Sequence, residues 1–153
     1  MKRHLIYLIS FTVALIVVLV GCSKKPELEL EVHEITMTTK SVSLVISASG
    51  TGSVTIDWGD GTPKETHKLT VSLYSKYFSH SYSETIEHNI KLTGNNIETF
   101  YISGLTTLDV SKNTKLRYLT CDRGNLTILD VSKNTELTDL YCKNNQLTSL
   151  DVS

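Results

Sequence analysis

The chain has 153 residues, a length that allows one or two small domains. Its formal net charge is -1, so it lacks both the basic excess of nucleic-acid-binding proteins and the acidic excess of a solvating tail. Thr, Ser, Val, Ile and Tyr dominate after residue 25, where helix formers are sparse. These residue types favour strands, so we expect an all-β protein.

The N-terminus has the features of a segment that is removed by processing. Lys2 and Arg3 precede the apolar run Leu5–Val20, and the letters LVGC end at Cys22. This stretch resembles the lipobox of bacterial lipoproteins. The resemblance implies that residues 1–21 are a signal peptide and that the thiol of Cys22 is acylated. The alternative is a plain transmembrane anchor, for which the run is short, because a span needs about 20 apolar residues.

The same resemblance implies a location. A lipoprotein carries palmitate or similar chains, and each buried methylene contributes about 0.8 kcal/mol to membrane binding. Ser23 after the cysteine fits sorting to the outer membrane, with residues 22–28 as a short tether. Lys24 and Lys25 come before the first acidic residue, so the periplasmic and the cell-surface side both stay open.

Residues 29–92 alternate between apolar and polar side chains and are interrupted by Gly/Ser turns, which predicts a small β-sandwich. The stretch VTIDWGDGT, residues 54–62, together with His80-Ser81-Tyr82, resembles the signature of PKD-like domains. That resemblance implies an immunoglobulin-like fold. The Gly-x-Tyr stretch usual after the second element is missing, so the end of the sandwich departs from the family pattern.

Two interpretations of Asp57 and Asp60 stay open. Asp60-Gly61 is a strong turn signal, whereas paired aspartates could also hold calcium. The twelfth position counted from Asp57 is Lys68, where a helix-loop-helix calcium site needs a glutamate. We expect the turn, with Trp58 in the core and His80 packed or hydrogen-bonded near Tyr82. We expect no metal and no cofactor.

Residues 93–153 contain an internal repeat. The letters LDVS begin at Leu108, Leu129 and Leu150, each 21 residues after the one before, and the two lines between them align without a gap. Each unit consists of two phrases, L-x-x-L-D-V-S-K-N-T-x and L-x-x-L-x-C-x-x-x-x. The pattern resembles the nested leucine-rich repeats of bacteria. The resemblance implies a solenoid with short parallel strands on both sides, and the last unit is expected to be incomplete.

The repeat predicts which side chains face inward, because positions two apart on a strand share a face. These positions are Leu108, Val110, Leu119, Cys121, Leu129, Val131, Leu140 and Cys142. Asn113, Asn134 and Asn145 are expected to turn the chain and to bond the neighbouring unit, with Gly124 as a gap in that series. We expect Cys121 and Cys142 to be small buried apolar groups, although their spacing also leaves a disulfide open.

The repeat extends upstream by the same spacing. Ile90-x-Leu92 matches Leu140-x-Cys142, and Phe100-x-Ile102 matches Leu150-x-Val152. We therefore predict that the last strand of the sandwich is also the first strand of the solenoid.

The outward positions of the repeat are the candidate partner surface. They are Arg117, Tyr118, Thr120, Arg123, Asp139, Tyr141 and Lys143. Tyr and Arg are enriched at interfaces, although they are also ordinary strand residues. The sequence contains no recognisable catalytic motif, so we predict a binding protein for a protein or glycan, without nucleic acid and without enzymatic activity. The alternatives are a structural spacer or adhesin stalk and, less favoured, an enzyme.

Overall fold

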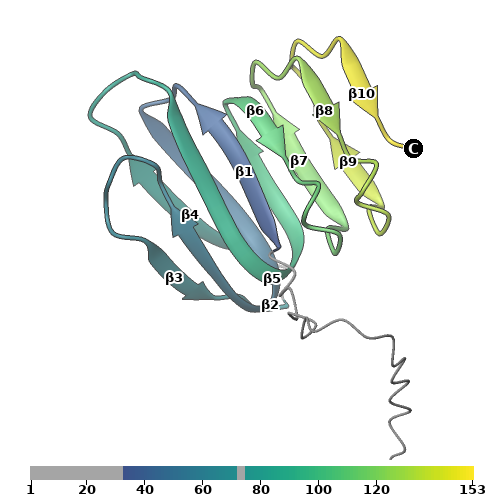
Figure 1. The fold of residues 1–153 in the computed structure, drawn as a ribbon, viewed down its shortest axis with the longest axis horizontal. Coiled ribbons are helices and arrows are strands. Elements are labelled where there is room, and N and C mark those ends of the chain that lie inside the picture. Colours follow the sequence, from purple (N-terminus) through teal and green to yellow (C-terminus); the bar gives the residue numbers. More distant parts are fainter. Residues whose placement is uncertain (1–32, 72–74) are drawn as a thin grey trace, which may run out of the picture. The chain divides into compact units, whose positions relative to one another are not determined.

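The computed structural model describes residues 33–71 and 75–153 (Figure 1). The predicted signal peptide 1–21, the lipidation site Cys22 and the tether 22–28 lie outside the described residues, as does the start of the expected sandwich. The described part of the chain contains strands and no helix, so the all-β prediction is confirmed. None of its elements is a helix long and apolar enough to cross a membrane.

The strands are β1 (Glu34–Thr39), β2 (Ser43–Asp57), β3 (Glu65–Lys68), β4 (Lys76–Ser81), β5 (His88–Ser103), β6 (Leu105–Asp109), β7 (Tyr118–Asp122), β8 (Ile128–Asp130), β9 (Asp139–Tyr141) and β10 (Ser149–Asp151). Burial alternates along strands with one apolar face. In β1, Ile35 and Met37 are buried, and the alternate residues Glu34, Thr36 and Thr38 are half-buried. This is the period of two that a strand requires.

The two longest strands, β2 and β5, pair antiparallel along most of their lengths, from Ser47 opposite Tyr101 to Asp57 opposite Lys91. Different strands flank the two ends of the β2–β5 ladder. The first half of β2 pairs with β4, and the second half of β5 pairs with β7, which pairs with β9. We call this set, β4–β2–β5–β7–β9, the β7 side.

The other halves form a second set. The second half of β2 pairs with β3, and the first half of β5 pairs with β1, which pairs with β6. We call this set, β3–β2–β5–β1–β6, the β6 side. The boundary expected between residues 92 and 93 falls inside β5, which runs through it without interruption.

One cluster of buried apolar side chains extends from Ile35 to Val131, with Trp58 and Phe100 as its largest fully buried members. Full burial of such a side chain contributes about 1.5–3 kcal/mol, so this cluster is the main stabilising feature of the fold. Because the cluster includes residues from every strand from β1 to β8 except β3, the two parts of the chain share one core.

The upstream extension of the repeat was predicted in the wrong register. Phe100 and Ile102 lie beside Leu119 and Cys121, in a parallel pair, and not at positions equivalent to Leu150 and Val152. Ile90 lies opposite Met37 in an antiparallel pair. Both phrases of the repeat share the spacing L-x-x-L-x-apolar, so the letters fit either phrase, and only the pairing partners distinguish them.

The strands of the repeated segment pair in parallel at the repeat distance. Leu119 lies beside Leu140 on β7 and β9, and Leu129 lies beside Leu150 on β8 and β10. β6 differs, because it pairs antiparallel with β1 and places Leu108 opposite Met37. The first LDVS strand therefore joins the antiparallel sheet, and the later ones form the small parallel sheet visible beside it in Figure 1.

Candidate binding surface

The Gly-Asp-Gly-Thr stretch forms a turn whose backbone is capped by its own aspartates. Gly59 and Gly61 have φ angles of 76° and 84°, which residues with a side chain rarely adopt. Asp57 accepts a hydrogen bond from the backbone N–H of Gly59 at 3.1 Å, and Asp60 accepts one from Thr62 at 3.0 Å. Both aspartates therefore have the turn role that the sequence favoured.

A row of rings packs behind this turn. Asp60 Oδ2 lies 2.7 Å from Nε2 of His80, whose ring stacks on Trp58 at 4.8 Å between centroids and meets Tyr82 edge-on. The Tyr82 hydroxyl donates to the backbone oxygen of Trp58 at 3.0 Å. Hydrogen bonds from Thr62 and His80 hold the pKa of Asp60 well below its usual range. The predicted core position of Trp58 and the predicted packing of His80 near Tyr82 are confirmed.

The residues that could hold a metal do not converge. Across residues 33–71 and 75–153 there is no group of three or more His, Cys, Asp or Glu side chains placed to bind an ion. The carboxylate of Asp57 instead pairs with the ammonium group of Lys64 at 3.1 Å.

The predicted inward positions are buried in the first units and less so in the last. Leu119 and Leu129 have no exposed surface, and Cys121 is 2% exposed. Leu108, Val110 and Val131 are buried with them. Leu140 and Cys142 are half-buried against the same core, because β9 pairs with β7 on one edge only.

The asparagine series bonds one unit to the next, as predicted. The Nδ2 group of Asn113 donates to the carbonyl of Ile97, and that of Asn134 donates to the carbonyls of Val110 and Asn113, at 3.0 and 2.8 Å. Asn145 donates to the carbonyl of Cys121 at 2.8 Å. The carbonyls of Val110 and Asn113 also accept a backbone N–H within their own turns, so the amide of Asn134 uses their second lone pair.

Position 124 is occupied by glycine because the backbone of Leu105 and the side chain of Asn145 approach it closely. A Cβ atom at this position would lie 2.6 Å from the backbone oxygen of Leu105 and 2.8 Å from Oδ1 of Asn145. The Asn145 oxygen instead accepts the N–H of Gly124 at 3.1 Å. The glycine therefore makes room for the amide of the next unit.

The two cysteines of the repeat are free thiols. Burial raises the pKa of Cys121 to about 12, so its thiol stays protonated at neutral pH. This agrees with a small apolar role in the core.

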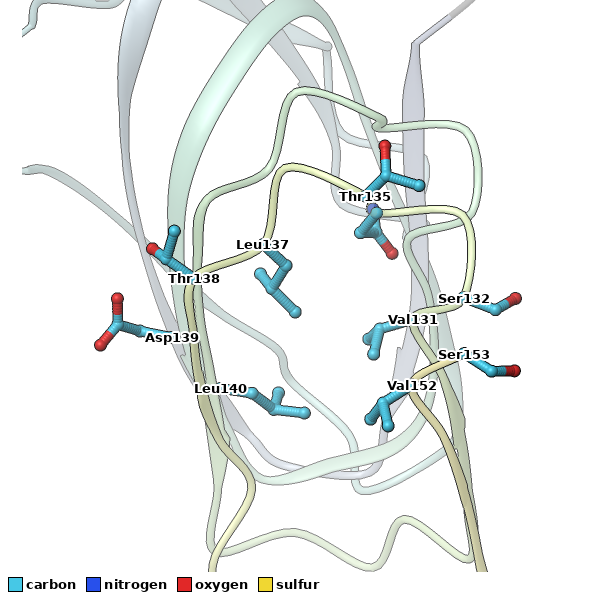
Figure 2. Close-up of a pocket in the computed structure, with 10 residues that line it drawn as sticks. Val131, Ser132, Thr135, Leu137, Thr138, Asp139, Leu140, Val152 and Ser153 are labelled. Atoms are coloured by element: carbon cyan, nitrogen blue, oxygen red, sulfur yellow. The ribbon is translucent and has the colours of Figure 1, made fainter.

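A hollow of about 400 Å³ lies at the end of the core beyond β9. Figure 2 shows Val131 and Val152 pointing toward Leu137 and Leu140 from opposite sides. Its lining is the continuation of the apolar core, with Asp139 and two serines at the rim.

The predicted partner surface lies partly on the outer face of β7 and β9. Tyr118 and Tyr141 are 42% and 45% exposed, Arg117, Arg123 and Lys143 are exposed, and Thr120 and Asp139 are half-buried. The Tyr118 hydroxyl bonds the Asp139 carboxylate, which lies beside it in the register and raises the pKa of that hydroxyl above its ordinary value. Arg123 is in a turn with a φ of 54°, where its N–H bonds the carbonyl of Lys143.

Sequence reasoning missed part of this face. Tyr101 on β5 lies directly beside Thr120 and is 38% exposed, and Tyr77 on β4 is 73% exposed on the same side. Ser47 lies between them in the register, opposite both tyrosines. Alternation places Tyr77 and Tyr101 outward on their strands, but no local pattern places the two strands on the same side as β7.

Comparison of this chain with protein-family models, with curated proteins and with solved structures finds no match.

Proposed function

We propose that this protein is a lipid-anchored binding protein of the bacterial outer membrane, which recognises a protein or glycan through the outer face of the β7 side. The observation that carries the proposal is the group of exposed tyrosines on that face. Tyr101, Tyr118 and Tyr141 lie on three consecutive parallel strands, and none is covered by another element of the described chain.

Physical chemistry explains why such a face binds. A tyrosine contributes a large contact area with few rotatable bonds and a polar tip, so it loses little conformational entropy when it is immobilised. The three side chains project from paired strands, whose backbone hydrogen bonds fix their spacing. A rigid surface reduces the entropy cost of association.

The proposed architecture is a PKD-like sandwich that continues into leucine-rich repeat coils. It is supported by the capped Gly-Asp-Gly-Thr turn and by hydrogen bonds that recur between residues 21 positions apart, such as Asn134 to Asn113 and Thr148 to Thr127. Each unit then presents the same strand positions to a partner.

The test compares two matched variants. Tyr118→Ala with Tyr141→Ala removes the aromatic surface of the β7 side, whereas Ile128→Ala removes an exposed side chain, 63% exposed, at the equivalent position of β8. Full-length protein in detergent is incubated with labelled envelope proteins and polysaccharides. We expect wild type and Ile128→Ala to retain a component that the double tyrosine variant releases.

The alternative of a spacer or stalk makes the opposite prediction. Under that alternative, the double tyrosine variant and wild type retain the same components, or neither retains any. An enzyme is the less favoured proposal, because the close His–Asp pair of the described chain, His80 with Asp60, is engaged in the turn.

A further inference from the structure

Five strands of the β7 side carry one continuous row of outward side chains. Directly paired positions run from Tyr77 on β4 through Ser47 and Tyr101 to Thr120 and Tyr141 on β9. Tyrosine therefore alternates with a small hydroxyl residue. Adjacent strands lie about 4.8 Å apart, so successive tyrosines of this row are about 10 Å apart.

The row contains a groove at Ser47. Val45, Tyr77, Tyr101 and Thr120 line it together with Asp122 and Arg123, and its volume is about 270 Å³. This is slightly below the ~300–1,000 Å³ of pockets that hold drug-sized ligands. The groove therefore fits one or two rings, and the open row on either side fits the rest of a longer chain.

Ser47 is an independent sign of a ligand. Its side chain is 4% exposed, and its hydroxyl has no hydrogen-bond partner among the residues that the structure describes. A buried hydroxyl without a partner costs roughly 1–3 kcal/mol. Because the Oγ atom of Ser47 has almost no accessible surface, a ligand group recovers that cost only when the side chains around the groove move to admit it. Ser47 is at the base of the groove between two tyrosines.

We infer that this row binds an extended chain of neutral hexoses, with one sugar ring in the groove over Ser47. Pyranose rings present C–H faces, which pack on aromatic faces, and a rim of hydroxyl groups. Two linked pyranoses are comparable in length with the spacing of successive tyrosines, which is about 10 Å because two strand separations lie between them. The Ser47 and Thr120 hydroxyls and the Asp122 carboxylate supply partners for sugar hydroxyls. Asp122 and Arg123 together add no net charge at the groove, which favours a neutral ligand.

A peptide strand fits this face less well. The groove lies on the face of a sheet, where the backbone groups of β2 and β5 already bond each other. A peptide that recognises a sheet by adding a strand needs a free edge instead.

This inference rests on the proposed function and names its ligand class. The test uses full-length protein in detergent and immobilised neutral gluco-, manno- and galacto-oligosaccharides of two to six units, with oligosaccharides of uronic acids as the charged comparison. We expect at least one neutral series to bind, with an affinity that rises with chain length.

The variants locate the site. Tyr101→Ala should weaken binding about tenfold or more, as loss of a central aromatic contact does. Tyr101→Phe should bind nearly as wild type, because the ring face remains. Ser47→Ala should weaken binding severalfold, and Ile128→Ala on β8, outside the β7 side, should leave it unchanged. Thermal unfolding midpoints check that each variant is folded.

The outcomes separate the two proposals. If no neutral oligosaccharide binds while an envelope protein is still retained through Tyr118 and Tyr141, this inference is overturned and the proposed function stands. Preference for uronic acids, or neutral binding that Tyr101→Ala and Tyr77→Ala both leave intact, also overturns it. If neither sugars nor envelope components bind, both proposals fall.

Discussion

Single buried asparagine side chains connect successive units of the repeat. Asn134 is 3% exposed and donates to two backbone carbonyls of the preceding unit. Asn134→Ala removes both of these bonds, while the carbonyls of Val110 and Asn113 keep the backbone N–H donors of their turns. Each lost bond has a net worth of about 0.5–1.5 kcal/mol. We expect a loss of about 1–3 kcal/mol in the free energy of unfolding, measured by urea denaturation.

The matched control is Asn125→Ala. Asn125 is exposed, and its side chain only accepts a bond from Gln146, so we expect a loss under about 0.5 kcal/mol. Equal losses for the two variants would show that the buried amide does not stabilise the stack.

Because the pKa of Asp60 is lowered in the folded chain, we expect the stability of the protein to depend on pH. The pKa of this carboxyl group is depressed below the ordinary 3.8, first by Thr62 and then by His80. A depressed carboxyl group stabilises the fold above its unfolded pKa, and this contribution is lost as the pH falls toward the folded pKa. The difference in melting temperature between wild type and Asp60→Asn should therefore be constant above about pH 5 and shrink below pH 4.

Thr62→Val separates the effect of Thr62 on the pKa of Asp60 from that of His80. It removes the hydroxyl that donates to Asp60 and leaves the Asp60 carboxylate in place. Its melting temperature should fall less steeply in acid than that of wild type and more steeply than that of Asp60→Asn. A wild-type advantage that persists unchanged to pH 2 would contradict the assignment.

At the scale of elements, the β2–β5 pair depends on a glycine where its register shifts. Gly50 has a φ of 149°, and a Cβ atom there would lie 1.9 Å from the backbone oxygen of Asn96. Gly50→Ala must push the two strands apart, so we expect a loss of about 2–5 kcal/mol, by urea denaturation.

Gly52 provides the comparison on the same strand. Its φ is 80°, but nothing lies within 4 Å of a Cβ atom at that position. Gly52→Ala should cost only the backbone strain, about 1–2 kcal/mol. If Gly50→Ala costs no more than Gly52→Ala, close strand approach is not the reason for the glycine.

At the scale of the whole molecule, the continuous core predicts one unfolding transition. Trp58, the single tryptophan, directly precedes the Gly-Asp-Gly-Thr turn, whereas Leu129 lies in the repeat. Both side chains belong to one buried cluster. Leu129→Ala should cost about 2–5 kcal/mol. Its denaturation midpoint should shift equally by Trp58 fluorescence and by circular dichroism, because the two parts unfold together.

Leu150→Ala is the control, since Leu150 is 45% exposed at the equivalent position of the next unit and should cost less. A fluorescence transition that stays in place while the dichroism transition moves would mean that the two parts unfold separately.

Attachment to the membrane is also a property of the whole protein. If Cys22 is acylated, Cys22→Ser should abolish incorporation of a labelled fatty acid and move the protein from the membrane fraction to the soluble fraction. A variant that stays labelled, or a wild type that never takes up the label, would rule out the lipid anchor.

The features that depend on local spacing could be predicted from the amino-acid sequence. The all-β class, the buried leucines of the repeat, the bonding asparagines and the turn at Asp60 follow from alternation and from the chemistry of a few adjacent residues. These features are readable because a strand repeats every two residues and a turn spans about four.

Which strands pair with one another is known from the folded chain alone. The fold places Phe100 beside Leu119, pairs β6 antiparallel with β1, and aligns Tyr77 with Ser47 and Tyr101 in one row. The physical reason is that pairing joins residues far apart in the chain, and both phrases of the repeat have the same apolar spacing. Local pattern therefore fits several registers equally well, and the packing of the shared core selects one.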